Sequence, residues 1–265
     1  MTRIDRIEGR RLFGQDPASY DAARPGHPER VYAILRTRCG LSRNTRVLEI
    51  GPGTGQATRE LLRRDASVVV VEPSEQLADH LAATLGDQIQ VLRTALEDAS
   101  LPPASFDLAA AASSFHWIDE AVGLEAIHAA LHHGGWIALW WTLFGEGSAP
   151  DAFIRATTPL LEGLDSSPTK GTTGRPPHAL VEARTAALDE GGFDEVEHEL
   201  VRWRSSWDAS GIRALYGSFS PILRLADDDR TRFLDEIALI AERDFGGRVE
   251  RELTTSLYTA RKPER

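Results

Sequence analysis

The chain has 265 residues, of which 42% are hydrophobic and 26% charged, as is usual for a soluble globular protein. Its formal net charge of −10 argues against a nucleic-acid partner and against a basic helix on a membrane surface, because both require positive charge. The single cysteine excludes an intrachain disulfide and a cysteine-based zinc site, and no spacing of histidines and acids suggests another metal site. The start resembles no secretory signal and no apolar run reaches membrane-spanning length, so we expect a cytoplasmic protein.

Residues 1–45 form a polar lead followed by one predicted helix. Pro28 suits the first turn of that helix, and Gly40 is a typical residue at which a helix stops. We therefore expect residues 1–45 to be an N-terminal helical segment.

Residues 46–142 alternate between short apolar runs and helical patterns. The four valines of residues 68–71 are typical of a strand that is buried on both faces of a parallel sheet. The alternation predicts an α/β fold with a doubly wound, seven-strand Rossmann-like sheet, to which this region contributes the core. The expected strands are 46–50, 68–71, 89–92, 106–112 and 136–141, and the expected helices are 56–64, 74–85 and 120–131.

Residues 143–265 are expected to supply an inserted helical lid and the last two strands, within one domain overall. Glycines and prolines accumulate between residues 144 and 177, which predicts a helix over 151–164 followed by a mobile loop. The remaining elements are expected as a strand over 196–207, helices over 209–225 and 227–245, and a closing strand over 252–260.

The sharpest motif is a glycine turn directly after the first strand, Gly51-Pro52-Gly53-Thr54-Gly55. A dinucleotide-binding turn would carry its third glycine one residue later, at Gln56, so the spacing disfavours a nicotinamide cofactor. The spacing matches the loop that holds the methionine part of S-adenosylmethionine. Glu72 ends the valine strand, where an acid can bind ribose hydroxyls; the alternative is a helix-capping acid before Pro73.

These motifs together resemble the class I S-adenosylmethionine-dependent methyltransferases, over nearly the whole chain. Within them the chain is similar to the branch that holds trans-aconitate methyltransferase and the ubiquinone/menaquinone-type C-methyltransferases. Each motif is weak alone, and their order and spacing carry the resemblance. The motifs are residues 20–26 (YDAARPG), 48–55 (LEIGPGTG), 71–74 (VEPS), 105–107 (SFD), 113–117 (SSFHW) and 134–136 (GGW).

The resemblance implies a set of cofactor-binding residues. Glu49 and the turn would hold the methionine amine and carboxylate, Tyr20 and Arg24 would close over that end, and Glu72 would bind the ribose. The family usually carries an acid for the adenine where this chain has Ala95, which leaves the Leu96 amide and Glu97 or Asp98 as candidates. The complete set is Tyr20, Arg24, Glu49, Gly51, Gly53, Thr54, Gly55, Glu72, Pro73, Gln76, Ala95, Leu96, Glu97 and Ser113.

The candidate catalytic residue is His116, which follows the fourth strand. A hydroxyl or carbon acceptor needs its proton removed, and the histidine is the obvious base nearby; an ionised carboxylate needs no base. The alternative is that His116 packs on Trp117 and shapes the pocket. Phe115, His116, Trp117 and Trp141 are the expected acceptor-binding residues. The late aromatic residues either line the acceptor pocket or fill the core; they are Trp136, Trp140, Trp141, Phe144, Trp203, Trp207, Tyr216 and Phe219.

The sequence therefore predicts methyl transfer from S-adenosylmethionine to a small-molecule acceptor, with S-adenosylhomocysteine as the product. O-methylation of a carboxylate or hydroxyl is favoured over C- or N-methylation. Two alternatives stay open: a protein that binds the cofactor without transferring its methyl group, and a nicotinamide oxidoreductase, which the glycine spacing disfavours. We expect a monomer or homodimer with no nucleic-acid or membrane partner.

Overall fold

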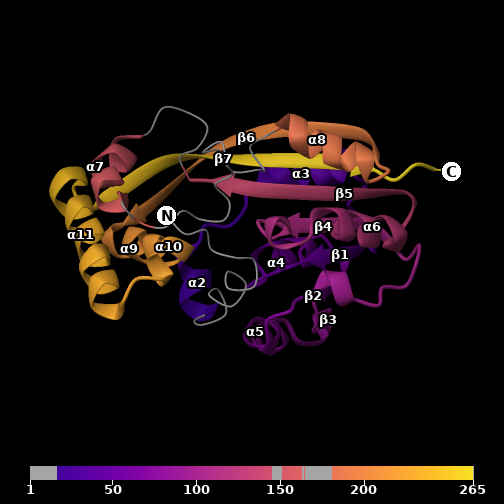
Figure 1. The fold of residues 1–265 in the computed structure, drawn as a ribbon, viewed down its shortest axis with the longest axis horizontal. Helices are drawn as coiled ribbons and strands as arrows, with labels where there is room; N and C mark the ends of the chain where they lie inside the picture. The colour runs from indigo at the N-terminus through magenta and orange to yellow at the C-terminus, as the bar shows by residue number, and fades with distance from the viewer. Residues whose placement is uncertain (1–16, 145–150, 163, 165–180, 265) are drawn as a thin grey trace.

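The computed structural model describes residues 17–144, 151–162, 164 and 181–264, and its centre is a seven-stranded sheet in the order β3-β2-β1-β4-β5-β7-β6 (Figure 1). Strands β1 to β5 pair in parallel, whereas β7 runs antiparallel to both β5 and β6. This mixed sheet confirms the predicted α/β fold. The strands are β1 (Arg46–Ile50), β2 (Ser67–Val71), β3 (Ile89–Leu92), β4 (Phe106–Ala112), β5 (Leu131–Leu143), β6 (Asp194–Asp208) and β7 (Arg248–Arg261).

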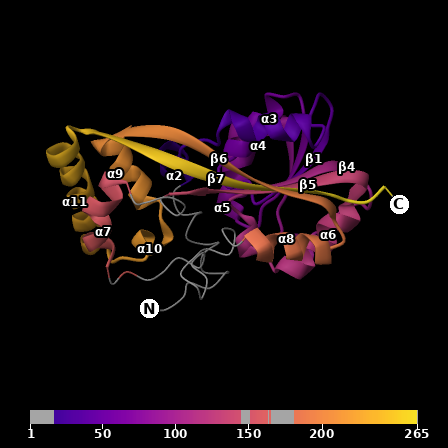
Figure 2. The same ribbon diagram turned by 90° about the horizontal axis from the view of Figure 1, so that it is seen from above.

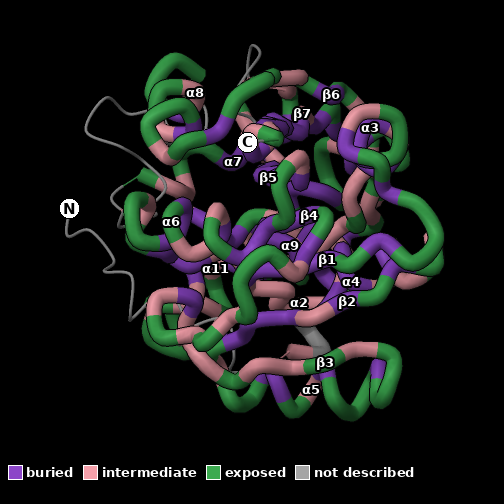
Figure 3. Tube along the Cα trace, turned by 90° about the vertical axis from the view of Figure 1, so that its right-hand side faces the viewer, coloured by how far each residue is buried: buried purple, intermediate pink, exposed green. Residues whose placement is uncertain are grey.

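Helices cover both faces of the sheet (Figure 2). Successive residues of a strand point to opposite faces, so Val47 packs in one buried cluster and Leu48 in the other. This double burial explains the run of four valines in β2, and Figure 3 shows buried segments at the centre and exposed ones on the outer helices. One face carries α3 (Glu29–Thr37), α4 (Gln56–Leu62) and α5 (Glu75–Leu85), and the other carries α6 (Glu120–Ala130) and α8 (Val181–Glu190).

Four further helices form a helical lobe at the far end of the long strands β6 and β7 (Figure 1). The lobe has its own apolar core, in which Phe153, Ile212, Tyr216 and Ile237 are buried. The lobe lies against α2 (Pro17–Ala23), which also contacts α5 of the main sheet. The lobe consists of α7 (Ala152–Leu161), α9 (Ala209–Gly217), α10 (Ser220–Leu223) and α11 (Asp227–Phe245).

Several elements differ from the sequence prediction. The predicted helix over 209–225 is interrupted, since α9 ends at Gly217 and a separate short helix, α10, begins at Ser220 with Pro221 in its first turn. Helices α2 and α8 were not predicted from the sequence. The apolar pattern of α8 is weak because Arg184 occupies its buried side. Strand β5 begins five residues before the predicted start, and the predicted loop over 165–177 lies outside the described residues. None of the described helices is both long and apolar enough to cross a membrane.

Candidate functional site

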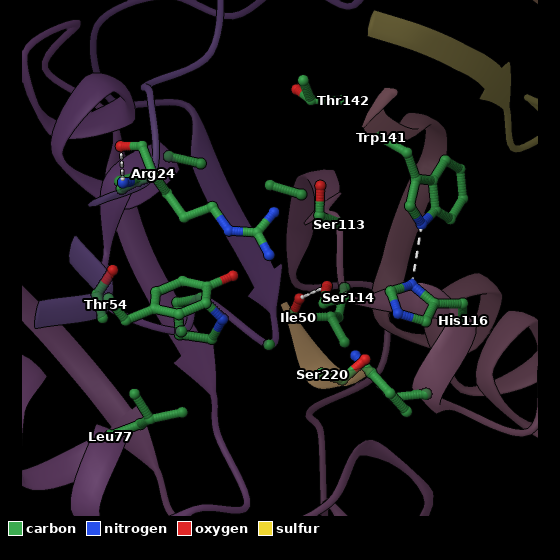
Figure 4. A pocket seen from close by; sticks show the side chains of 18 of the residues that line it. Arg24, Ile50, Thr54, Leu77, Ser113, Ser114, His116, Trp141, Thr142 and Ser220 are labelled. Atoms are coloured by element: carbon green, nitrogen blue, oxygen red, sulfur yellow. Dashed lines mark hydrogen bonds between the residues drawn. The ribbon is translucent and has the colours of Figure 1, made fainter. Parts of the chain in front are cut away.

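A cavity of about 540 Å³ opens at the carboxyl ends of β1, β2 and β4, and the helical lobe closes its far side (Figure 4). Ligands of open α/β sheets bind at this edge, and the volume is in the range of small-molecule sites. The cavity brings together most of the residues predicted from the sequence. Those that line it are Tyr20, Arg24, Gly51, Gly53, Thr54, Glu72, Pro73, Ala95, Leu96, Ser113, His116, Trp117 and Trp141.

The glycine turn gives the cavity a bare backbone wall. Gly51, Gly53 and Gly55 have φ angles of +61°, +59° and +85°, which side-chain-bearing residues rarely adopt. A Cβ at Gly51 would lie 2.6 Å from the Ser114 Cβ, whereas a Cβ at Gly53 would meet nothing within 4 Å. Because Gly53 also lines the cavity, the space that its missing side chain leaves is open to a ligand. The turn thus fits a ligand that lies directly against the backbone.

Glu72 stands at the end of β2 and lines the cavity although only 4% of its surface is exposed. Its Oε1 accepts a hydrogen bond of 2.9 Å from the Ser74 backbone N–H, which orients the carboxylate. Ser74, and not Glu72, caps α5 with its side chain. The carboxylate is therefore a fixed hydrogen-bond acceptor in the cavity wall. Val71, Leu77 and Leu96 add apolar side chains to the lining of the same cavity.

Helix α2 connects the glycine turn to the helical lobe. Asp21 accepts a hydrogen bond of 2.8 Å from the Thr54 hydroxyl, and its two oxygens lie 2.7 and 2.9 Å from the Arg59 guanidinium. One turn later, Arg24 Nε donates a hydrogen bond of 2.7 Å to the Ser218 hydroxyl of the lobe. These contacts connect Asp21 and Arg24 to the glycine turn and to the helical lobe.

The Arg24 guanidinium points into the cavity (Figure 4). It lies 4.8 to 5.2 Å from the ring centres of Tyr20, Phe144 and Phe219. No carboxylate of the described residues forms an ion pair with it, since its hydrogen bonds go to Ser218. A half-buried cation in this position suits an anionic group of a ligand.

The third wall of the cavity follows β4. Ser113 has a φ of +57°, an unusual value for serine, and its backbone N–H donates to the Trp140 carbonyl at 2.7 Å. The ring centre of His116 lies 4.5 Å from that of Trp117, and its Nδ1 accepts a hydrogen bond of 3.0 Å from the Trp141 Nε1. The histidine is therefore held in place at the cavity wall.

The predicted residues that do not line the cavity are Glu49, Gly55, Gln76, Glu97 and Phe115. Glu49 and Gly55 face the helices behind the turn, and Gln76 is exposed on α5. The Glu97 carboxylate accepts a hydrogen bond of 3.2 Å from the backbone at the start of α6. Phe115 is 1% exposed and belongs to the apolar core. Sequence spacing could not separate these positions from the cavity wall, because adjacent residues face in different directions.

Glu49 is fully buried, and neither of its carboxylate oxygens has a hydrogen-bond partner in the described part of the chain. Burial raises the pKa of this carboxyl to about 7, and the nearby Thr58 hydroxyl and, less strongly, the charge of the Arg59 guanidinium offset only part of the effect. A buried carboxyl whose ionisation is unfavourable thus lies behind the glycine turn.

Most of the lobe's contribution to the cavity was missed by the sequence analysis. The only available signal was the late group of aromatic residues, of which Phe144 and Phe219 do line the cavity, whereas Tyr216 fills the lobe's core. The described residues contain no group of three or more potential ligands arranged around a metal position. The additional lining residues from the lobe and its approach are Leu143, Leu161, Leu164, Ser220, Pro221 and Ile222.

Comparisons with known proteins agree with this geometry. A family model described as a methyltransferase domain matches residues 48–139. An uncharacterized methyltransferase of Geobacillus thermodenitrificans is 34% identical over 148 residues, which cover 52% of this chain and 68% of that protein. An uncharacterized methyltransferase of Mycobacterium tuberculosis is 26% identical over 225 residues, or 85% of this chain and 83% of that protein.

A solved structure extends the similarity to the whole fold. Phosphoethanolamine N-methyltransferase 2 of Haemonchus contortus, in complex with phosphomonomethylethanolamine and S-adenosylhomocysteine, has a TM-score of 0.59 and 15% identity. The match covers 98% of this chain and 60% of that one. None of these comparisons singles out the trans-aconitate branch, which stays a prediction. The matched methyltransferase domain, the relatives and the glycine turn at the cavity place this chain in the class I S-adenosylmethionine-dependent methyltransferases.

Proposed function

We propose that the cavity holds S-adenosylmethionine along the glycine turn and a small acceptor beneath the helical lobe. The bare backbone at Gly51 and Gly53 supports contact with the methionine end, and Arg24 supplies a cation for its carboxylate. The fixed Glu72 carboxylate supports acceptance of ribose hydroxyls, and the apolar lining residues Leu77 and Leu96 suit the adenine. Glu49, Gly55, Gln76, Glu97 and Phe115 are left out of the proposed contacts.

The cofactor supplies an electrophilic methyl group on a sulfonium ion, so the protein's task is to align the acceptor and exclude water. Asp21, Arg24 and Ser218 tie α2 and the residue after it to the glycine turn on one side of the cavity and to the helical lobe on the other. The observation that carries the proposal is one cavity that contains both the glycine turn and His116.

The acceptor is proposed to be a small molecule with an apolar body, methylated on oxygen. Its part of the cavity is apolar where the lobe contributes Leu161, Phe219 and Ile222, and it is polar near His116 and Ser113. C- or N-methylation is the second candidate. A non-methylating use of the cofactor is the third.

We expect a screen of small acceptors to identify a carboxylic acid or hydroxyl compound that releases S-adenosylhomocysteine. The panel contains phenyl and alkyl carboxylic acids with the matching alcohols and amines, and the readout is S-adenosylhomocysteine by mass spectrometry. The Glu72→Ala variant is the control for release that depends on the cofactor site. Release with amines alone would replace the O-methylation proposal by N-methylation. Binding of S-adenosylhomocysteine without release on any acceptor would favour the non-methylating alternative.

A further inference from the structure

The hydrogen bond between Trp141 and His116 defines the protonation of the histidine ring. The indole Nε1 carries a hydrogen and has no lone pair to offer, so it can only donate. His116 Nδ1, 3.0 Å away, must then present its lone pair to this hydrogen. A neutral imidazole that accepts at Nδ1 carries its single proton on Nε2.

The indole that makes this bond is fixed on several sides. Trp141 lies on β5 with 2% of its surface exposed. The guanidinium of Arg184 lies 5.3 Å from the indole ring centre, and Tyr258 packs edge-on at 6.2 Å. Arg184 is itself buried and forms an ion pair with Glu120. The Trp141 ring therefore cannot turn to release His116 without disturbing α8 and β7.

The second nitrogen of the histidine ring faces the cavity. Figure 4 shows Nδ1 directed at the Trp141 indole and the opposite side of the ring directed toward the middle of the cavity. His116 and Trp141 both line the cavity, and Figure 4 shows Arg24 on the opposite side. The group that the ring offers to an acceptor is thus an N–H.

We propose that Trp141 is a positioning residue that holds His116 as the Nε2–H tautomer, so that His116 donates a hydrogen bond to the acceptor instead of removing its proton. The proposal rests on the proposed function for the reaction itself. It narrows the acceptor to one whose reacting atom already has an available lone pair, with an anionic oxygen as the best match to an N–H donor. For a carboxylate, an oxygen lone pair forms the new O–C bond, the S–C electron pair leaves with sulfur, and no proton is released.

The tautomer can be measured without an acceptor. The protein is labelled with ¹⁵N at its histidine rings, and long-range ¹H–¹⁵N spectra are recorded with and without S-adenosylhomocysteine; His116→Gln identifies the His116 signals. We expect an unprotonated Nδ1 and a protonated Nε2 in both states. Trp141→Phe keeps the ring but removes the N–H, so the two nitrogen signals should move toward each other as the tautomers mix. A protonated Nδ1 in the wild type, or an unchanged spectrum in Trp141→Phe, would overturn the proposal.

Kinetics of two substitutions separate a donor from a base. The amide of His116→Gln can place an N–H near the Nε2 position, whereas His116→Asn places its amide near Nδ1 and leaves the acceptor without a donor. With the best acceptor of the screen, whether acid or alcohol, we expect His116→Gln to keep kcat within about tenfold. We expect His116→Asn to raise KM, because the acceptor loses a hydrogen bond from the ring position. A base would instead lose about 10²–10⁴-fold in kcat in both variants, and that result would refute the donor role. Failure of the proposed function is recognised separately, as a lack of S-adenosylhomocysteine binding.

Discussion

Replacing Glu49 with glutamine is expected to raise the free energy of unfolding at about pH 8 by about 3 kcal/mol. The carboxyl is fully buried without a hydrogen-bond partner in the described structure, and burial raises its pKa from 4.5 to about 7. Above that pH the folded protein must ionise a desolvated group, whereas the unfolded chain ionises it in water. Glutamine at this position stays neutral at every pH.

The sign of the pH dependence makes this prediction specific. Between pH 4.5 and about 7 the folded protein retains a proton that the unfolded chain has lost, so Glu49 makes stability fall as the pH rises through this range. Urea unfolding at several pH values should show nearly equal stability of wild type and Glu49→Gln at the acidic end and a growing difference toward neutral pH. The same difference in free energy of unfolding between wild type and Glu49→Gln at every pH would contradict the prediction.

Glu60 on the neighbouring helix provides a matched control. Burial alone would raise its pKa, but hydrogen bonds and charges of Arg64 and Arg63 outweigh this and lower the pKa. Its stabilising contribution is present at neutral pH and is lost as the pH falls through the folded pKa. Glu60→Gln should therefore reduce stability at neutral pH, opposite in sign to Glu49→Gln.

Gly51→Ala is expected to reduce the free energy of unfolding by about 2–4 kcal/mol. The positive φ of +61° strains any L side chain, and the new Cβ would lie 2.6 Å from the Ser114 Cβ. Ser114 would have to move and give up the hydrogen bond that it donates to the Ile50 carbonyl. Chemical unfolding monitored by circular dichroism measures the loss.

Alanine substitutions at two other glycines distinguish the effect of backbone strain from that of a steric clash. Gly53 has nearly the same φ, +59°, but open space around its Cβ position. Gly53→Ala should therefore lower the free energy of unfolding through backbone strain alone, by about 1–2 kcal/mol. Its methyl group would enter the cavity and weaken cofactor binding. Gly26 has neither a positive φ nor a close neighbour, so Gly26→Ala should be nearly neutral. Equal losses for Gly51→Ala and Gly53→Ala would show that the approach to Ser114 is not limiting.

The sheet core was predictable because its signals are local. The valines of β2 and the glycine turn after β1 are short patterns, each only a few residues long, that indicate buried parallel strands. Helix α8 was not predictable in this way, since its inward position is filled by Arg184, a residue that normally marks a solvent face. Pro221 is a local signal for the interruption between α9 and α10, because proline suits the first turn of a new helix.

The candidate site was predictable where one motif supplies several neighbouring residues. Gly51, Gly53 and Glu72 were found because they follow strands, and strand ends meet at one edge of the sheet. The wall from the lobe could not be found, because Leu161 and Phe219 come together only through tertiary packing. The same holds for His116: its role depends on Trp141, 25 positions along the chain, and on the direction of one hydrogen bond.

The cofactor site itself is tested most directly by isothermal calorimetry with S-adenosylhomocysteine and NADH on the wild type and Glu72→Ala. We predict that the wild type binds S-adenosylhomocysteine and not NADH, and that the bound form melts at higher temperature. Loss of the Glu72 carboxylate, which Ser74 orients at the cavity, should weaken S-adenosylhomocysteine binding by about 1.5–3 kcal/mol. Binding of NADH without binding of S-adenosylhomocysteine would contradict the assignment of this cavity.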